Sequence, residues 1–429
     1  MVTYPLVSGV PTGYNYAAKP LDNYGQWFDG SNMNIRQYAD LFTTSNLTIP
    51  PVITNLYNGA GLAVSSKFFG LTWQKWPALN AANIQVSRYG VTLDQQGFTP
   101  TTVRSHDHNP SGLKSLRWHH IELTKGVFDW TVFDNWVDTH FAAGRDLLFV
   151  VAFPPATLAP AGTGTSSYDN GAVPSSANRA PINMADVADF VTAIYNRRPG
   201  KIKWFSCWNE INQIGMYDDT ATKYAQMLRT MSQTLKALDP TIKILAPVIN
   251  GVTSAARTVF SNILAASDGA GGTGATGAGA EKWIDVADFH FYYEGPTLYN
   301  AFAADLAAFK AILTANGLGG VELWCTEIGL KETQVSHSVT LAPLTEEAQR
   351  QRLVLRMLYQ LAVGGISRAI WYSMDSTLLS PFYYSTNLTT LRALINQHVD
   401  YLVGGQVTLI NQLADQRLAV TAAAQNFLI

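Results

Sequence analysis

Eight short apolar runs recur along the chain from residue 67 onward, and amphipathic helical patterns fill several of the gaps between them. Near-continuous Val, Ile, Leu, Phe and Trp is typical of parallel strands that are buried on both faces. Because these runs alternate with helical patterns, they predict repeated βα units around a parallel sheet. The runs span residues 67–73, 101–106, 146–153, 202–210, 242–249, 286–292, 321–327 and 369–374.

Four segments carry the apolar spacing of helices that pack on such a sheet. Asn183 is a candidate N-cap for the first helix, and Asp239-Pro240, Gly317 and Gly364-Gly365 are candidate stops for the others. We expect these apolar faces to cover the sheet rather than a partner protein. The apolar positions span residues 187–194, 224–235, 302–313 and 353–361.

Eight strands over about 310 residues predict an α/β fold, a (β/α)8 TIM barrel, whose usual length is roughly 200 to over 400 residues. A doubly wound open sheet is the alternative, but no Gly-x-Gly-x-x-Gly pattern follows an early strand. The Gly-rich stretch 268–280 lacks the Lys-Ser/Thr pair of a phosphate-binding loop. It therefore predicts a flexible surface loop after the fifth strand.

Composition and hydrophobic pattern divide the chain into three parts. Residues 1–66 are rich in Gly, Pro, Asn, Thr and Tyr, and predict a loop-rich N-terminal extension with a few short strands. Residues 67–378 form the predicted barrel. Residues 379–429 predict a C-terminal helix and short antiparallel strands beside the barrel, in the runs QVTLI, RLAVTA and NFLI.

Charge and composition argue against several classes of partner. The chain has 29 Lys and Arg against 31 Asp and Glu, a net charge of −2, whereas nucleic-acid binding needs a concentrated positive field. The first residues lack a signal-peptide pattern, and no apolar run is long enough to span a membrane. Cys207 and Cys325, the two cysteines, exclude a disulfide scaffold and are predicted to be buried free thiols. The sequence does not indicate an oligomeric state.

Two acidic residues end apolar runs where reactive groups are expected. Glu210 closes the fourth predicted strand and Glu327 closes the seventh. In a TIM barrel, the carboxyl ends of the strands form the mouth that carries the active site, and buried acids there cost desolvation energy. Two carboxylates that face each other across such a mouth suit glycoside hydrolysis, in which one donates a proton and the other attacks the anomeric carbon.

The sequence around both acids resembles a known group of enzymes. Trp208-Asn209-Glu210-Ile211-Asn212 is similar to the Trp-Asn-Glu-Pro-Asn signature of the clan A retaining glycosidases, with Ile211 in place of Pro. Thr326-Glu327-Ile328-Gly329 resembles their nucleophile-bearing motif. Over about residues 67–376 the chain looks most like glycoside hydrolase family 39 and its exopolysaccharide-cleaving relatives. Further matching motifs are Arg104-Ser105-His106-Asp107, Phe153-Pro154-Pro155, His290-Phe291-Tyr292 and Trp371-Tyr372.

This resemblance implies a role for each matched residue. Glu210 would be the acid/base, with its pKa raised by desolvation, and Glu327 would be the nucleophile, kept ionised by the charge of Arg104. Asn209 would hydrogen-bond the 2-hydroxyl of the sugar. No cofactor is implied. The other expected substrate-binding residues are His106, which contacts the sugar, His290, which lines the wall, Tyr292, which orients Glu327, and Trp371, which stacks on a pyranose.

A metal site is the weaker interpretation of the histidines. His106 and His108 share one face of a strand, and His119 adjoins His120, so both pairs resemble metal ligands. The spacing permits coordination without being diagnostic of it. We therefore expect no metal.

The substrate follows less directly from the sequence. Charged residues make up only 14% of the chain, against 11 Trp and 19 Tyr, which suits contact with neutral or mildly acidic sugar polymers. We expect a carbohydrate polymer or oligosaccharide as partner and endo action on a polysaccharide or exopolysaccharide. The alternatives are an exo-acting β-xylosidase-like or iduronidase-like enzyme and a non-catalytic glycan-binding barrel. The N-terminal extension without a signal would suit extracellular or virion-associated depolymerisation.

Overall fold

The computed structural model describes most of the predicted barrel and both terminal regions beside it. The predicted extension as far as residue 51 lies outside the described residues, and so does His106. The description covers residues 52–62, 64–72, 102–105, 116–160, 177–293, 296–330, 346–372, 398–413, 418–423 and 425–428.

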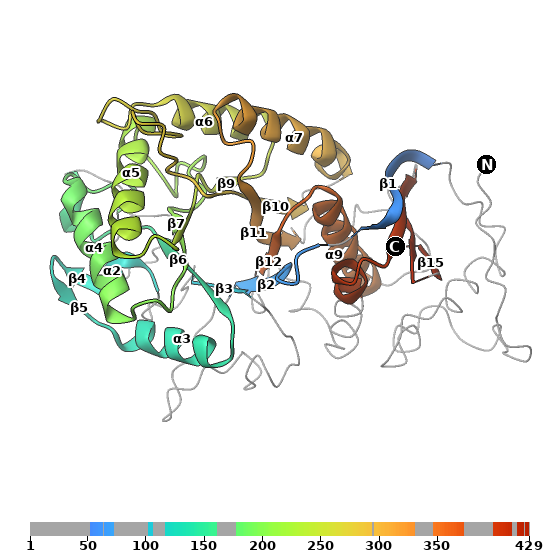
Figure 1. Cartoon of the computed structure of the whole chain (residues 1–429), viewed down its shortest axis with the longest axis horizontal. Helices are drawn as coiled ribbons and strands as arrows, with labels where there is room; N and C mark the ends of the chain where they lie inside the picture. The colour runs from blue at the N-terminus through green and yellow to red at the C-terminus, as the bar shows by residue number, and fades with distance from the viewer. Residues whose placement is uncertain are drawn as a thin grey trace, which may run out of the picture.

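A parallel sheet forms the centre of the protein and closes on itself, because β11 pairs with both β10 and β12. Each of the eight predicted apolar runs supplies a strand, so the predicted barrel is confirmed. Figure 1 shows the helices arranged around the outside of these strands. The strands are β2 (Phe69–Thr72), β3 (Thr102–Arg104), β6 (Asp146–Val151), β7 (Trp204–Cys207), β8 (Lys243–Leu245), β9 (Ile249–Asn250), β10 (Val286–Tyr293), β11 (Glu322–Leu330) and β12 (Arg368–Tyr372).

Three helices begin at a residue whose side chain caps the first turn. Asn183, Thr220 and Thr253 each accept a hydrogen bond from a backbone N–H in the first turn of α4, α5 and α6. The four predicted helices correspond to α4, α5, α7 and α9, whereas the sequence analysis did not identify α3 and α6. The helices are α2 (Trp118–Ile121), α3 (Thr131–Ala142), η3 (Ala156–Leu158), α4 (Met184–Arg197), α5 (Ala221–Leu238), α6 (Ser254–Ala265), α7 (Pro296–Ala315) and α9 (Glu346–Val363).

The side chains of strand β10 point alternately to the two faces of the sheet. Phe289 and Phe291 face outward and pack against Phe302 of α7, with ring centroids 6.1 and 4.0 Å apart. The intervening Asp288, His290 and Tyr292 point into the barrel, where the polar contacts lie. This one strand therefore supplies both the helix-packing core and a column of interior polar groups.

A buried cation closes the amino-terminal end of the barrel. The Arg368 guanidinium lies between the rings of Trp204 and Trp324, 4.5 and 4.3 Å from their centroids. It also donates to Asp146 Oδ2 at 2.7 Å. Above it, Trp324 packs in an interior apolar layer with Leu148, Leu245, Val286 and Ile370. This end of the barrel is therefore filled by side chains, as expected for a barrel that is packed rather than open.

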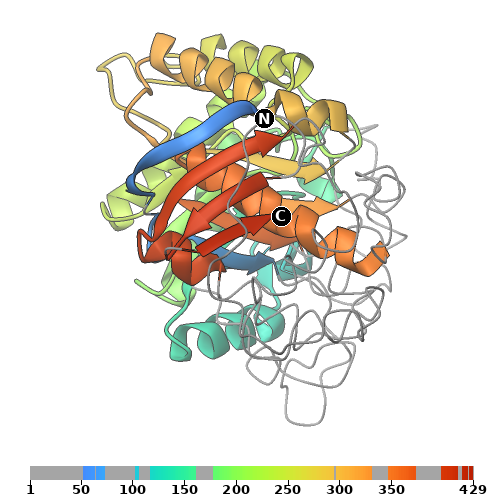
Figure 2. The ribbon, with the colours of Figure 1, turned by 90° about the vertical axis from the view of Figure 1, so that its right-hand side faces the viewer.

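Segments from both ends of the chain form a second, antiparallel sheet. The strand β1 (Val52–Leu62) pairs with β13 (Val407–Leu413), which continues into β14 (Leu418–Ala422) and β15 (Gln425–Leu428). Figure 2 shows β1 lying alongside the C-terminal strands. The predicted antiparallel strands of the C-terminal segment are confirmed, and a strand from the N-terminal segment joins them.

The Gly-rich stretch is held in a defined conformation, in contrast to the predicted flexible loop. Asp268 Oδ1 accepts the N–H groups of Ala270 and Gly272 at 2.8 and 2.9 Å. A Cβ atom on Gly274 would lie 2.1 Å from the carbonyl oxygen of Ile263, so this close approach requires glycine. The glycines therefore serve tight packing against α6.

The sequence also predicted no membrane-spanning segment and two buried free cysteines. No helix in the described part of the chain combines the length and hydrophobicity needed to cross a bilayer. Cys207 and Cys325 are buried and unpaired by disulfide, as predicted. Burial raises the pKa of the Cys207 thiol to about 12, so this group stays protonated and unreactive at neutral pH.

Replacing Arg368 by Ala is expected to lower the free energy of unfolding by about 3 kcal/mol, because it removes a buried cation from between two indole rings together with its ion pair to Asp146. Lys67→Ala is the matched control, since Lys67 also pairs with Asp146, at 3.5 Å, but is 40% exposed. That variant should lose less than about 0.5 kcal/mol. Urea unfolding of both variants measures the difference, and equal losses would contradict this account of the barrel floor.

Candidate active site

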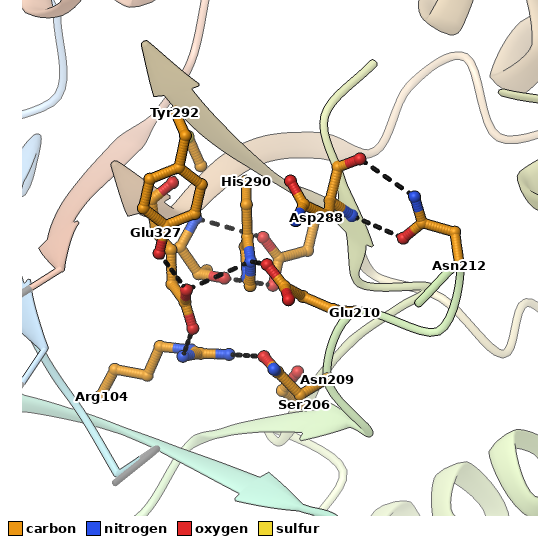
Figure 3. Close-up of polar contacts among 12 residues, drawn as sticks. Arg104, Ser206, Asn209, Glu210, Asn212, Asp288, His290, Tyr292 and Glu327 are labelled. Atoms are coloured by element: carbon orange, nitrogen blue, oxygen red, sulfur yellow. Dashed lines mark hydrogen bonds and ion pairs between the residues drawn. The ribbon is translucent and has the colours of Figure 1, made fainter. Parts of the chain in front are cut away.

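Glu210 and Glu327 meet at the carboxyl-terminal end of the barrel, although 117 residues separate them in sequence. One oxygen of each carboxylate and a ring nitrogen of His290 all lie within 4.8 Å of one another. His290 Nδ1 is 2.9 Å from Glu210 Oε1 and 3.3 Å from Glu327 Oε2. Figure 3 shows the imidazole between the two acids. The two acids that end apolar runs in the sequence thus share one buried site.

Both oxygens of Glu327 accept hydrogen bonds from side chains on other strands of the barrel. Arg104 Nη1 on β3 donates to Oε1 at 2.5 Å, and the Tyr292 hydroxyl on β10 donates to Oε2 at 2.5 Å. Arg104 is completely buried, so protein rather than water surrounds its charge, and the attraction between Arg104 and Glu327 is only weakly screened. These two donors fix the orientation of the Glu327 side chain.

Asn209 is tied to the same cation. Arg104 Nη2 donates to Asn209 Oδ1 at 2.7 Å, which orients the amide and turns its NH2 group away from the guanidinium (Figure 3). Asn209 Nδ2 is buried and has no hydrogen-bond partner among the described residues. A buried donor without a partner costs free energy, so this atom is a candidate contact for a ligand.

His290 is a neutral side chain in this site. Burial lowers the pKa of its imidazole to about 3, despite the opposing attraction of Glu327. Because Nδ1 faces two carboxylate oxygens, we assign the ring proton to Nδ1, where it is donated to the acids. The ring therefore orients the pair without adding a full positive charge.

The turn after β7 directs Glu210 inward through unusual backbone geometry. Trp208 and Glu210 have φ values of 68° and 43°, in the left-handed region that non-glycine residues rarely adopt. Hydrogen bonds hold the turn: Trp208 N–H donates to Val151 O, and its indole donates to Met216 O at 2.9 Å. Such conformations cost about 1–3 kcal/mol each and cluster at functional sites.

The structure also accounts for the departure from the Trp-Asn-Glu-Pro-Asn pattern. The backbone N–H of Ile211 donates to the carbonyl oxygen of Val248 at 3.0 Å. Proline has no N–H and would lose this bond. Asn212 strengthens the same connection, because its side-chain amide donates to Asn250 O and accepts from Asn250 N–H. The loop after Glu210 is thus fastened to the next strand of the barrel.

A cavity of about 400 Å³ adjoins the ring of Tyr292. It lies between the loop after Glu210, the loop after β9 and helices α6 and α7. Amides, a carboxylate and aromatic rings line it, which is a mixture suited to hydroxyl-rich ligands. The lining includes Asn212, Gln213, Asn250, Phe291, Phe302 and Asp305.

Trp371 does not present a surface to this site. It has no exposed area and belongs to the core between the sheet and the helices, so its predicted stacking on a sugar is not supported. The reason is the alternation of β12, which places Tyr372 on the inner face instead. The Tyr372 ring lies 6.1 Å from that of Tyr292. Sequence reasoning missed Tyr372, although it adjoins the predicted Trp371.

Asp288 is a second interior residue that the sequence analysis missed. It is completely buried below His290, and burial raises the pKa of its carboxyl to about 7 against the attraction of Arg104. The signal was present in the sequence, since Asp288, His290 and Tyr292 alternate with aromatic residues. Polar residues at every second position of an apolar strand indicate an interior polar column.

Of the histidines in the metal interpretation, His106 and His108 lie outside the described residues. Among the described residues, the group of acids and histidines close enough to hold an ion is Glu210, His290 and Glu327. The Arg104 guanidinium already contacts Glu327, and its charge opposes a divalent cation there. His119 is buried, with Nδ1 3.1 Å from the carbonyl oxygen of Phe153, and lies outside this group.

Asp288→Asn is expected to change how stability depends on pH. The native carboxyl keeps its proton up to about pH 7, whereas the unfolded chain releases it near 3.8. The native state therefore binds more protons in this window, and its stability falls as pH rises from 4 to 7. The variant lacks this loss, so its stability relative to wild type should rise by about 1.4 kcal/mol per pH unit between pH 5 and 7. Urea unfolding at pH 5, 6 and 7 measures this gain, and parallel curves would contradict the buried titration.

Comparison with known proteins identifies the fold through structure alone. No protein-family profile and no curated protein sequence matches the chain. A solved glucosidase from Croceicoccus marinus is 13% identical and matches with a TM-score of 0.55, over 87% of this chain and 78% of that one.

Two solved enzymes of glycoside hydrolase family 39 match equally well. A β-xylosidase from Caulobacter crescentus is 17% identical, with a TM-score of 0.53 over 86% of this chain and 78% of that one. The enzyme from Xanthomonas axonopodis pv. citri is 14% identical, with a TM-score of 0.54 over 88% and 76%. The chain therefore has the fold of the family 39 glycosidases of clan A, which its motifs predicted.

Proposed function

We propose that the protein is a retaining glycoside hydrolase in which Glu327 is the nucleophile and Glu210 is the acid/base. The observation that carries this proposal is the buried carboxylate pair at the barrel mouth, with oxygens within 4.8 Å of each other. Retaining glycosidases hold their two carboxyl groups about 5–5.5 Å apart, whereas inverting enzymes need room for a water molecule between acid and base.

The two acids differ in their surroundings, which supports different roles. Glu327 receives hydrogen bonds from a cation and a phenol, which suit an ionised nucleophile. It attacks the anomeric carbon as the bond to the leaving oxygen breaks, and Glu210 donates a proton to that oxygen. Glu210, now ionised, then takes a proton from the water that hydrolyses the glycosyl–enzyme bond and releases Glu327.

Neutral His290 supports the acid role of Glu210. A protonated imidazole at 2.9 Å would stabilise ionised Glu210 by direct attraction and weaken it as a proton donor. Because burial keeps His290 uncharged, Glu210 receives only a hydrogen bond. The unpaired Nδ2 of Asn209 supports a contact to the sugar 2-hydroxyl, which strengthens in the transition state.

We further propose a polysaccharide or exopolysaccharide substrate that is cleaved within the chain. The amide-lined cavity beside Tyr292 has room for a sugar unit beyond the one held by the acids. Exo action of the β-xylosidase type is the alternative, because a solved structure with this fold is a β-xylosidase. An iduronidase-like enzyme and a non-catalytic glycan-binding barrel would also fit this fold.

Replacing either catalytic acid by Gln should abolish most activity. Glu327→Gln removes the nucleophile and should lower kcat by at least about 10³-fold on every glycoside. Glu210→Gln should lower kcat similarly on substrates with poor leaving groups. Its kcat/KM should fall much less on aryl glycosides with acidic phenols, because these leave without protonation and kcat/KM reports the step that releases them. A panel of aryl glycosides measures this difference.

Glu322→Gln is the matched control, since Glu322 lies on the same strand as Glu327 but at the opposite end of the barrel. It accepts a hydrogen bond from the Trp324 indole at 3.0 Å, which a Gln oxygen also accepts. Its activity should equal that of the wild type. Full activity in Glu327→Gln, or hydrolysis of no glycan by the wild type, would refute the proposed function.

Product analysis separates the proposed modes of action. Endo cleavage should release a range of oligosaccharides at early times and lower the mean polymer size steeply, because internal bonds are cut first. The first-formed product should keep the anomeric configuration of the substrate, as a double displacement requires. Size-exclusion chromatography and time-resolved NMR measure these quantities. Early release of monosaccharide alone would establish exo action, and an inverted product would exclude the nucleophile role of Glu327.

A further inference from the structure

Strand β11 contains a one-residue bulge immediately before Glu327. On one side, Phe289 of β10 pairs with Cys325 and His290 pairs with Glu327, so Thr326 has no partner in this register. On the other side, the pairing with β12 also gains a residue between Cys325 and Ile328. Both neighbouring strands therefore place the irregularity at the same point.

The bulge decides which side of the sheet Glu327 faces. Trp324 belongs to the interior apolar layer and Cys325 to the outer core. Strict alternation would put Thr326 inside and Glu327 outside, against the helices. Instead both side chains contact interior groups, and Ile328 returns to the outer core. Bulges re-aim side chains beside active sites in this way.

Asp288 holds the bulged residue with both of its oxygens. The backbone N–H of Thr326 donates to Asp288 Oδ1 at 3.2 Å, and the Thr326 hydroxyl lies 2.7 Å from Oδ2. The carboxyl thus supplies an acceptor to a backbone N–H whose residue pairs with neither neighbouring strand. Figure 3 shows Asp288 beside His290, and both lie on β10, the strand adjacent to that of Glu327.

We propose that Asp288 is a positioning residue for Glu327, which acts by holding the bulge at Thr326 so that Glu327 faces Arg104 and Tyr292. This inference rests on the proposed nucleophilic role of Glu327. Asp288 has no exposed surface, so it touches neither substrate nor water from the mouth. Its hydrogen bonds run to Thr326, the residue next to Glu327.

The environment of Asp288 argues against a role in stability. A fully buried carboxyl costs desolvation energy, and within the described residues no Lys or Arg forms an ion pair with it. The titratable and charged groups that act on it are Arg104 from β3, Tyr224 from α5, and Cys325 and Glu327 from β11.

The test compares four variants by steady-state kinetics on an aryl glycoside that the wild type hydrolyses. Asp288→Ala should lower kcat about 10²-fold with KM nearly unchanged, since a misplacement of about 1 Å costs that much. Asp288→Asn keeps an acceptor for the Thr326 N–H and a donor for its hydroxyl, so it should restore most of the loss. Thr326→Val removes one of the two bonds and should cost about tenfold or less.

Asp285→Asn is the control for a carboxyl at the start of the same strand. Asp285 pairs with Lys236 at the far end of the barrel from Glu327, so this variant should keep wild-type kcat. If Asp288→Ala fails to fold, Thr326→Val carries the kinetic test, because it preserves the shape of the side chain. Wild-type kcat in both Asp288→Ala and Thr326→Val would overturn the proposal.

Crystal structures of the wild type and Asp288→Ala give a readout that does not need activity. The proposal predicts that Glu327 Oε1 leaves Arg104 in the variant, whereas the wild type keeps this contact. Should the wild type hydrolyse no glycoside, displacement of Glu327 would still support the positioning role while the proposed function fails. An unmoved Glu327 together with wild-type kinetics would leave the glycosidase assignment intact and refute the role of Asp288.

Discussion

The buried guanidinium of Arg104 is the interaction on which the rest of the candidate site depends. From β3 it donates to Glu327 on β11 and to Asn209 after β7, so it connects three strands across the barrel. A buried cation is costly unless its partners are well placed, and Arg104 donates at 2.5 Å to Glu327 and at 2.7 Å to Asn209. Arg104 therefore orients two groups at once. One is Glu327, the proposed nucleophile, and the other is the Asn209 amide, the proposed contact to the sugar 2-hydroxyl.

The barrel interior supports this cation through layers of different polarity. Arg368 between its two indoles fills the floor, and an apolar layer lies above it. The layer that contains Asp288 and Arg104 comes next, and the carboxylate pair lies at the mouth. Alternation along each strand generates these layers, and the bulge at Thr326 is a local exception that brings Glu327 into the topmost one.

Sequence alone predicted the strands and the two acids, because buried parallel strands form apolar runs and a Glu at the end of such a run is conspicuous. It did not predict the orientation of single side chains, which depends on strand register and bulges. Trp371 and Tyr372 illustrate this limit, since one residue of register decides which ring faces the site. The Gly-rich stretch illustrates another, because composition suggests flexibility while backbone packing against Ile263 holds it in place.

Peptide mass spectrometry of the trapped enzyme detects the covalent intermediate that the proposed mechanism places on Glu327. An activated 2-deoxy-2-fluoro glycoside forms the glycosyl–enzyme but slows its hydrolysis, because fluorine destabilises the oxocarbenium-like transition state. If Glu327 is the nucleophile, one added sugar is expected on the peptide that contains Glu327, and none on the same peptide of Glu327→Gln. Label on another residue, or turnover of the reagent without any covalent adduct, would contradict it.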